Sequence, residues 1–510
     1  MSNLGNRCGF VSGIAIATML SGAAHAQGAQ GAEEATTSNE IVVTATKRNE
    51  SLTDVPISVQ VFTDQAIAER GINRAADFLS TTPNVTFIED NAGEAYINIR
   101  GQTSVRNSDP NVAIVIDGVT LSSVKPFNQD LFAIQQIEVL KGPQSALYGR
   151  NAAAGAIVIS TKKPSDEFEG NVVAAVGNWD TYRLNGSISG PISDTLGFAV
   201  AGSFRDTDGP FTNIVTGEKV HRNRSVAGRG RLLYDNLDGL TIDLKVGGHD
   251  TKGGGSAYNA QIAGSGIGGL PADPPVLDAN FATQDFLSNV RGEFTEEFWD
   301  ATLKIDYESD FATFTSISAY NRLDQYFGSD SPPYVPDTGA AGATIQQYAY
   351  LDKNLSQEVR LTSPSDQRLR WQAGFYYLRF TRNQTSNIMV DSDGTLPADP
   401  RALRLASSDH PSLAYSNPYY KTTSYAPFAS LEFDITDALE LRVAGRYDTE
   451  KRSIRERASA DINPLTGASY NNCVALTGLD FDDCTDSKTF KQFEPKASLT
   501  YELAPTASVY

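Results

Sequence analysis

Apolar and charged residues alternate along the chain from about residue 168 onward. In residues 439–447, for example, Val443 falls on one parity and Arg442 on the other, and residues 196–204 and 371–377 follow the same rule. Because successive side chains of a strand point to opposite faces, a period of two predicts a sheet that separates two unlike environments. In a transmembrane barrel, those environments are lipid outside and a polar lumen inside.

The links between these strands alternate between short and long. Short links are expected at residues 191–195, 236–239, 309–310, 365–367, 435–438 and 504–505, and long ones near 207–222, 251–298, 327–352, 383–421 and 452–489. Antiparallel up-and-down strands with one rim of short turns and one rim of long loops give this pattern, and in outer-membrane barrels the short turns face the periplasm. A soluble sandwich would mix loop lengths at both ends. We expect about twelve complete strands and a thirteenth that begins at Thr506.

Residues 51–164 have a different sequence pattern and are predicted to form one small α/β domain. The expected elements are a strand over 55–62, a helix capped by Thr63 or Asp64, a helix over 73–79, and strands around 96–101 and 112–119. Hydroxyl and carboxylate side chains cap the first turn of helices, which favours Thr63 or Asp64 as the start.

The densest stretch of this domain is Ile137–Pro164. It contains an apolar run, a turn at residues 141–143, a segment of small residues and a strand at 156–160. Three glycines, Gly142, Gly149 and Gly155, permit close approach of backbone to backbone. This stretch is therefore predicted to form the compact centre of the domain.

The N-terminus has the three parts of a secretory signal peptide. Arg7 supplies the positive region, residues 10–20 the apolar core, and Ala24-His25-Ala26 the cleavage site. No later apolar run is long enough for a transmembrane helix. The net charge of -19 argues against a nucleic-acid partner, which would require a basic surface. Residues 27–39 are small and polar and are expected to be disordered.

A short β-branched segment precedes the small domain. It consists of Glu40, Ile41, Val42, Val43, Thr44, Ala45 and Thr46. An extended segment between flexible flanks is suited to pairing with the sheet edge of a partner protein, and an ordinary edge strand would look the same.

Four motifs occur in order and carry a family resemblance: TPNV at 82–85, IRG at 99–101, IDGV at 116–119, and the stretch 137–164. The set closely resembles the plug domain of TonB-dependent outer-membrane receptors of the ligand-gated iron-complex type. The resemblance implies a mainly β fold, in which a small α/β plug is followed by a transmembrane antiparallel up-and-down β-barrel of 22 strands. Residues 1–26 would be the signal peptide, 27–50 the segment with the TonB box (residues 40–46), 51–165 the plug, and 166–510 a barrel incomplete in this chain.

The same resemblance implies a function and its partners. TonB, with its inner-membrane energising complex, would pull on the TonB box of a monomer embedded in outer-membrane lipid. The cargo would be a ferric siderophore by default, with cobalamin, an oligosaccharide or an aromatic compound as alternatives, and a truncated, non-functional receptor as a further one. No cofactor and no enzymatic activity are expected, since no nucleophile, base and orienting group are grouped in the sequence. A passive porin would need neither TonB box nor plug, and an adhesion role would need only the loops.

In the family, a plug arginine pairs with glutamates of the barrel wall. Arg100 matches that position, Arg150 is a second candidate, and strand parity places Glu358 and Glu432 toward the lumen as hypothetical partners. We refer to these four residues as the predicted lock.

The remaining candidates are cysteines and histidines. Cys473 and Cys484 are predicted to form a disulfide in an oxidising compartment, with a metal site at Asp480, Asp482 and Asp483 as the less favoured alternative. We interpret the three mature histidines, His221, His249 and His410, as surface residues, so that haem is a less favoured cargo and no metal site is expected.

Overall fold

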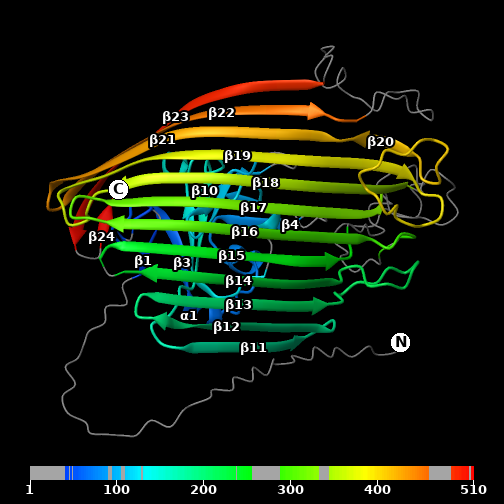
Figure 1. The fold of residues 1–510 in the computed structure, drawn as a ribbon, viewed down its shortest axis with the longest axis horizontal. Coiled ribbons are helices and arrows are strands. Elements are labelled where there is room, and N and C mark those ends of the chain that lie inside the picture. The colour runs from blue at the N-terminus through cyan, green and yellow to red at the C-terminus, as the bar shows by residue number, and fades with distance from the viewer. Residues whose placement is uncertain are drawn as a thin grey trace, which may run out of the picture.

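The computed structural model describes residues 41–510 apart from 45, 49, 90–94, 105–108, 128–129, 237, 256–285, 287, 332–343, 459–483 and 505–506. The predicted signal peptide, the segment 27–39, Glu40, Ala45, Cys473 and the three aspartates near it therefore lie outside the described residues. In the described part, strands predominate, and the small domain lies against one face of a large curved sheet (Figure 1).

The large sheet contains long antiparallel strands in strict chain order. They are β11 (Glu169–Gly177), β12 (Thr181–Ser193), β13 (Leu196–Thr207), β14 (Asn223–Asp235), β15 (Leu240–Gly253), β16 (Glu293–Glu308), β17 (Thr313–Asp330), β18 (Thr344–Thr362), β19 (Leu369–Val390), β21 (Pro418–Thr436), β22 (Leu439–Glu456), β23 (Thr485–Ala504) and the short β24 (Ala507–Val509). A further short strand, β20 (Ser412–Ser416), pairs only with β19. Within the described residues, this agrees with twelve strands and the start of a thirteenth. The sheet is not closed there, because β11 pairs with β12 alone and β24 with β23 alone.

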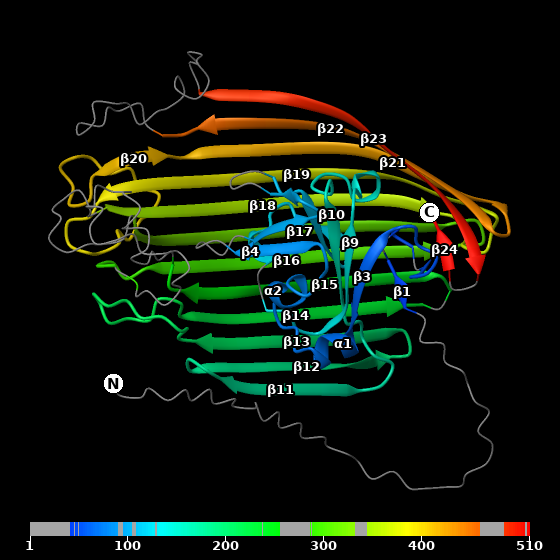
Figure 2. The same cartoon turned by 180° about the vertical axis from the view of Figure 1, so that it is seen from behind.

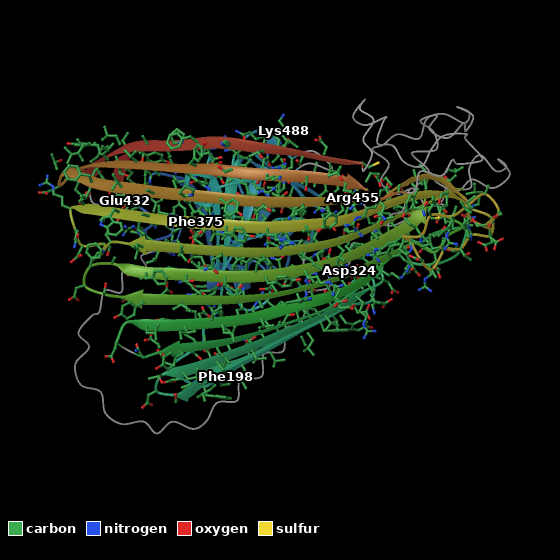
Figure 3. The ribbon with its side chains drawn as sticks, turned by 45° about the horizontal axis from the view of Figure 1, so that its top comes forward. Phe198, Asp324, Phe375, Glu432, Arg455 and Lys488 are labelled. Carbon is green, nitrogen blue, oxygen red and sulfur yellow. The ribbon has the colours of Figure 1, made fainter. Side chains whose placement is uncertain are left out.

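Side chains on the two faces of this sheet differ as the alternation predicts. Val200, Leu431 and Val443 are exposed on the outer face by 51%, 52% and 44%. The neighbouring positions Glu432 and Arg446 are buried on the inner face. Figure 3 shows Phe375 on the body of its strand, with Glu432 toward one end of the strands and Arg455 toward the other. An apolar outer band over a polar inner face is the arrangement of a barrel wall in lipid.

The predicted rims are present, with two differences. The first hairpin, at residues 178–180, is a short turn on the rim that otherwise carries the long loops. Several strands also continue further than expected: β17 and β18 remain paired out to Asp330 and Ile345. β17 thus takes up the first four residues of the predicted loop 327–352, and β18 the last nine. Where both faces of a strand are polar, apolar and charged residues no longer alternate in the sequence. The backbone hydrogen bonds between the strands nevertheless continue there, so the pattern underestimates the length of the strands. Spanning lipid takes only about 9–11 residues, so these strands project well beyond it.

The small domain, which we call the plug, has a sheet in the order β3 (Ser58–Thr63), β9 (Ile134–Lys141), β10 (Gly155–Thr161), β7 (Val112–Ile116) and β8 (Val119–Thr120). A second sheet contains β4 (Val85–Glu89), β5 (Ala95–Ile99) and β6 (Gln102–Thr103). The helices are α1 (Asp64–Glu69), α2 (Ala75–Leu79), the 3-10 turn η1 (Lys125–Phe127) and α3 (Ser145–Tyr148). Thr63 caps α1 by accepting a hydrogen bond from the Ala66 N–H, so one of its two predicted caps is confirmed.

The central plug sheet is apolar on both faces. Ile137 and Ile157 pack on one face against α2, whereas Leu140 and Val158 belong to a separate cluster on the other. Strands buried on both sides read as nearly continuous apolar runs, as β9 and β10 do. Both faces must therefore be covered: α2 packs on one of them, and α3 covers part of the other. The plug as a whole lies in front of the concave face of the large sheet (Figure 2).

Among the described residues, no helix is long and apolar enough to cross a membrane.

Close packing at Gly155 yields a first prediction. A Cβ on Gly155 would overlap the backbone carbonyl oxygen of Leu140 and touch Ile99. We expect Gly155→Ala to destabilise the plug by about 1–3 kcal/mol, the usual cost of overpacking. Urea-dependent proteolysis of the plug in outer-membrane preparations would measure this. Gly230→Ala is the matched control, because a Cβ there meets nothing within 4 Å. Equal resistance of the two variants would contradict the prediction.

Candidate functional site

The predicted TonB-box segment is folded onto the plug. Its strand β1 (Val42–Val43) pairs with β2 (Glu50–Ser51), and the Leu52 N–H donates to the Ile41 carbonyl at 2.9 Å. Val43 is 0% exposed and belongs to the apolar cluster of Leu140 and Val158. The segment therefore supplies part of the cover that the second face of the plug sheet requires.

Glu138 is the polar anchor of this segment. Its buried carboxylate accepts from the Thr44 N–H at 2.9 Å and from the Thr44 hydroxyl at 2.8 Å. Gln136 donates to the Val42 carbonyl at 2.9 Å, and the Tyr148 hydroxyl donates to the Thr44 carbonyl at 3.3 Å. Burial raises the pKa of Glu138, although the hydrogen bonds from Thr44 act in the opposite direction. Both main-chain groups of Thr44 are thus occupied by plug side chains, and a strand-pairing partner would have to displace them.

The residues after the segment bind the wall. Lys47 forms an ion pair with Glu358 at 2.7 Å and lies over the Phe428 ring. Arg48 donates to the carbonyls of Ser363 and Trp371 at 3.0 and 2.6 Å. Burial lowers the pKa of Lys47 to about 8, opposed by the charge of Glu358. These contacts fall at the ends of β18 and β19, on the rim of short turns. The segment therefore bridges plug and wall on the side where the short turns are expected to face the periplasm.

The structure does not bring the predicted lock together as expected. Arg100 occupies a left-handed turn after β5, where its exposed side chain lies near Gly142 and pairs with neither proposed glutamate. Glu358 and Glu432 are buried on the inner face, but Glu358 binds Lys47 and Arg360, and Glu432 binds Arg370.

Arg150 does link plug and wall, though through other carboxylates. It pairs with Asp109 at 3.2 Å on the plug and with Glu450 at 3.6 Å on β22. Strand parity correctly predicted that Glu358 and Glu432 face inward. Their ion-pair partners depend on how the plug sits against the wall, which a single sequence does not reveal.

A buried ionic cluster at Asp117 seats the plug on β14 and β15. Asp117, in the IDGV turn, accepts from the Thr161 N–H at 2.8 Å and from Lys245 at 2.9 Å. Arg231 donates to the Thr161 carbonyl at 3.1 Å and pairs with Asp243. Burial alone would raise the pKa of Asp117, but Lys245 and Arg231 outweigh it and hold that pKa below its usual range. The sequence analysis included Asp117 in the IDGV motif but missed Lys245 and Arg231. Their inward parity on apolar strands was the available signal.

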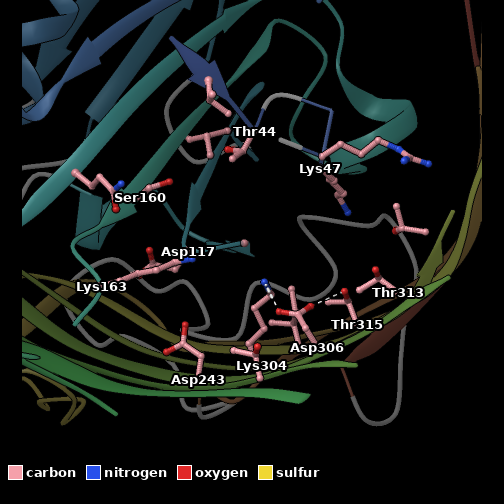
Figure 4. Close-up of a pocket in the computed structure, with 18 of the residues that line it drawn as sticks. Thr44, Lys47, Asp117, Ser160, Lys163, Asp243, Lys304, Asp306, Thr313 and Thr315 are labelled. Carbon is pink, nitrogen blue, oxygen red and sulfur yellow. Dashed lines mark hydrogen bonds and ion pairs between the residues drawn. The ribbon is translucent and has the colours of Figure 1, made fainter. Parts of the chain in front are cut away.

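A cavity of about 1380 Å³ lies between plug and wall beside this cluster. Figure 4 shows the labelled residues around it: Thr44, Lys47, Asp117, Ser160 and Lys163 from the plug side, and Asp243, Lys304, Asp306, Thr313 and Thr315 from the strands. Hydroxyl and charged groups make up most of this labelled set, while Val115, Val158 and Leu233 also line the cavity. The boundary between plug and wall is therefore a mixed polar and apolar surface here, and it is not tightly packed.

The remaining predicted residues are the cysteines and histidines. Cys484 is disulfide-bonded, and its predicted partner Cys473 lies outside the described residues. The surface interpretation of His249 and His410 is wrong, since both are buried. His249 binds Glu296 at 2.8 Å and stacks on Phe298, because an inward position in a plugged barrel is covered by the plug.

In this chain, a plug is held by buried ion pairs against the inner face of an antiparallel wall. This is the arrangement of outer-membrane receptors with a plug domain. Comparison with known families agrees. The family model "TonB-dependent Receptor Plug Domain" matches residues 51–156, and "TonB dependent receptor-like, beta-barrel" matches residues 233–510, more than half of the chain. The chain belongs to the TonB-dependent receptor family, a family of outer-membrane receptors and transporters.

Relatives and solved structures support this assignment. The chain is 31% identical over 450 residues to the pesticin receptor of Yersinia pestis, covering 86% of this chain and 60% of the relative. It is 30% identical over 205 residues to the ferric enterobactin receptor PirA of Pseudomonas aeruginosa, covering 36% and 28%. The crystal structure of the ferric yersiniabactin uptake receptor FyuA from Yersinia pestis matches with a TM-score of 0.72 at 19% identity, covering 88% of this chain and 62% of that one. The chain thus spans less than two thirds of the length of these relatives.

The anchor at Glu138 yields a second prediction. Glu138→Ala leaves the Thr44 N–H without its acceptor, which costs about 1–3 kcal/mol for a buried donor. We expect the segment to detach more often and trypsin to cut faster after Lys47 and Arg48, as followed by mass spectrometry of intact receptor. Glu69→Ala is the control, because Glu69 is exposed on α1 and, among the described residues, accepts a hydrogen bond from Gln65 alone. Cleavage at the unmodified rate in Glu138→Ala would refute the anchoring role.

The ionic cluster yields a third prediction. Asp117→Asn leaves Lys245 with only the longer pair to Asp300 at 3.7 Å. Since breaking a buried pair costs about 3–5 kcal/mol, the plug should be seated less firmly. We expect higher permeability of the outer membrane to small solutes, measured by antibiotic susceptibility. Arg100→Ala serves as the comparison and should leave permeability unchanged, because its side chain contacts no wall glutamate. A leak in Arg100→Ala but none in Asp117→Asn would reverse this assignment.

Proposed function

We propose that the chain carries out TonB-dependent active uptake of a scarce ligand, most simply a ferric siderophore, across the bacterial outer membrane. The observation that carries the proposal is the position of the segment 41–48. Its strand β1 is docked on the plug, and Lys47 ties the segment to the wall at the short-turn rim. A pull on this strand is transmitted directly to the plug sheet through Val43 and Glu138.

The proposed sequence of events follows from these contacts. A ligand arrives at the rim of long loops and binds there and on the plug. TonB pairs with the released strand from the periplasm and pulls, which breaks the contacts of Thr44 and Lys47. The boundary around Asp117 and the adjoining cavity then opens, and the ligand passes between plug and wall. No covalent bond of the ligand is made or broken in this scheme.

The substrate class rests on the relatives. A receptor named for ferric enterobactin is 30% identical to this chain over 205 residues, which favours an iron chelate. Cobalamin, an oligosaccharide or an aromatic compound is the second candidate class, since a plug of this design does not itself select the cargo. The segment 40–46 as TonB's binding site, a monomeric state and contact with outer-membrane lipid belong to the same proposal.

Deletion of residues 41–46 separates binding from transport and provides a fourth prediction. In cells that lack other uptake systems, we expect the deletion to keep binding of ⁵⁵Fe-loaded catecholate siderophore and to abolish its energised accumulation. Deletion of residues 30–35, of equal length and upstream, is the control and should accumulate normally. A proton uncoupler should reduce the control to the level of the 41–46 deletion.

The other outcomes discriminate between functions. Accumulation that survives both the 41–46 deletion and the uncoupler would indicate passive diffusion and overturn the proposal. Energised accumulation of cyanocobalamin but not of the siderophore would keep the mechanism and replace the cargo.

A further inference from the structure

A second candidate site lies at the opposite rim, among the long loops. Asp391 and Asp393 follow the end of β19, and His410 lies two residues before β20. One oxygen or nitrogen atom from each of the three side chains lies within 4.8 Å of the others. Asp391 and His410 are buried.

Carboxylate and amide oxygens beside this group lack hydrogen-bond donors. Oδ2 of Asp391, Oδ1 of Asp330 and Oδ1 of Asn289 have no partner within the described structure. The side chains of Asp391 and Asp330 are only 7% and 4% exposed. The Ser288 hydroxyl lies within reach of the Asp330 carboxylate but donates to the Val290 carbonyl, and the Ser392 hydroxyl lies 3.5 Å from Nδ1 of His410.

These residues are neighbours. The Asn289 N–H donates to the other oxygen of Asp330 at 2.9 Å. A Cβ on Gly394, in the turn after Asp391, would touch the Asn289 carbonyl, so this turn packs on the same residue. Burying acceptors without donors costs several kcal/mol, and far more when they are charged. A bound cation would remove that cost.

His410 is oriented as a ligand would be. Its Nδ1 lies 3.2 Å from the Val390 carbonyl, which fixes the tautomer that donates from Nδ1. The lone pair on Nε2 then faces Oδ1 of Asp393 at 3.3 Å. Metal-bound histidines commonly donate their other ring N–H to a backbone carbonyl in this way.

We propose that Asp391, Asp393 and His410 bind a divalent transition-metal cation such as Zn²⁺ or Mn²⁺, with Asp330 at the end of β17 and Asn289 before β16 facing it. The imidazole favours such a metal over Mg²⁺ or Ca²⁺, which prefer all-oxygen sites. Ligands at about 2.0–2.2 Å from the ion place their atoms slightly over 3 Å apart, so the group needs to contract modestly on binding.

The site would fasten the loop 391–411 to the strand ends. Leu396 in that loop already packs on Val290, Ile345 and Met389. A metal at Asp391 adds a bond between the end of β19, the end of β17 and the residues before β20. The inference does not depend on the transport proposal, although this rim is where an external ligand would enter under it.

The competing explanation is an ion pair between protonated His410 and Asp393 with no metal. It predicts that chelators and added metals leave the stability of the receptor unchanged. It also leaves the unpaired oxygens of Asp391 and Asp330 unexplained.

The test uses intact receptor purified in detergent through a tag without histidines and stripped with EDTA. Zn²⁺, Mn²⁺ and Ca²⁺ are titrated separately by calorimetry, and the melting temperature is recorded with and without each metal. The variants are Asp391→Asn and His410→Gln. Asn at 391 keeps the Oδ1 acceptor that holds the N–H groups of Asp393 and Gly394, so the turn survives. Asp409→Asn is the matched control, since Asp409 is exposed in the same loop and lies outside the group.

We expect one Zn²⁺ or Mn²⁺ per chain and a higher melting temperature in its presence. Both site variants should weaken binding at least about tenfold, the loss that even an outer-sphere partner causes. Asp409→Asn should bind normally. In EDTA, Asp391→Asn should melt no lower than the unmodified receptor, because it removes a buried charge. Absence of binding, equal loss in Asp409→Asn, or Ca²⁺ binding that survives His410→Gln would each overturn the proposal.

Discussion

The wall has an apolar outer face and an inner face that meets the plug, and the two faces impose opposite demands on its strands. Outward positions such as Val200 and Leu431 must be apolar, and the backbone must satisfy its own hydrogen bonds within the sheet. Inward positions are largely polar, although Phe298 and Leu323 of the wall join the apolar cluster of the plug. The plug is also held by buried ion pairs, of which Asp117 with Lys245 and Arg150 with Glu450 are examples. Such contacts fix orientation firmly but can be exchanged for water, which suits the movement that we propose for the plug.

The plug obeys a different constraint. Its central sheet is apolar on both faces; α2 packs on one of them, and α3 covers part of the other. The N-terminal strand helps to cover the other through Val43, while Glu138 occupies the main-chain groups of Thr44. The strand that we propose TonB to capture is therefore also a structural part of the plug. Its removal and the loosening of the plug are physically coupled, and no separate signalling device is required between them.

Several features were predictable from the sequence because they depend on local pattern. The order of the long strands, the short-turn rim, the α/β plug with its cap at Thr63, and the inward parity of Glu358 and Glu432 all follow from periodicity and turn chemistry. The partner of Arg100 could not be predicted in this way. The direction of its side chain depends on a left-handed turn and on how the plug sits against the wall. The buried positions of His249 and His410 were also missed. From sequence alone, a polar residue in a polar loop or on an inward face is predicted to be exposed. Its burial becomes apparent only when the segment that covers it is known.

The sequence by itself determined the class of fold, the two faces of each strand and the membership in a family, since these are set by residue order within a few positions. Tertiary structure alone decided which charges meet: Lys47 with Glu358, Arg231 with Asp243, and Asp330 beside Asp391. Charged side chains have many possible partners, and the choice among them depends on distances between segments tens to hundreds of residues apart. Those distances are fixed only when the plug, the wall and the loops are packed together.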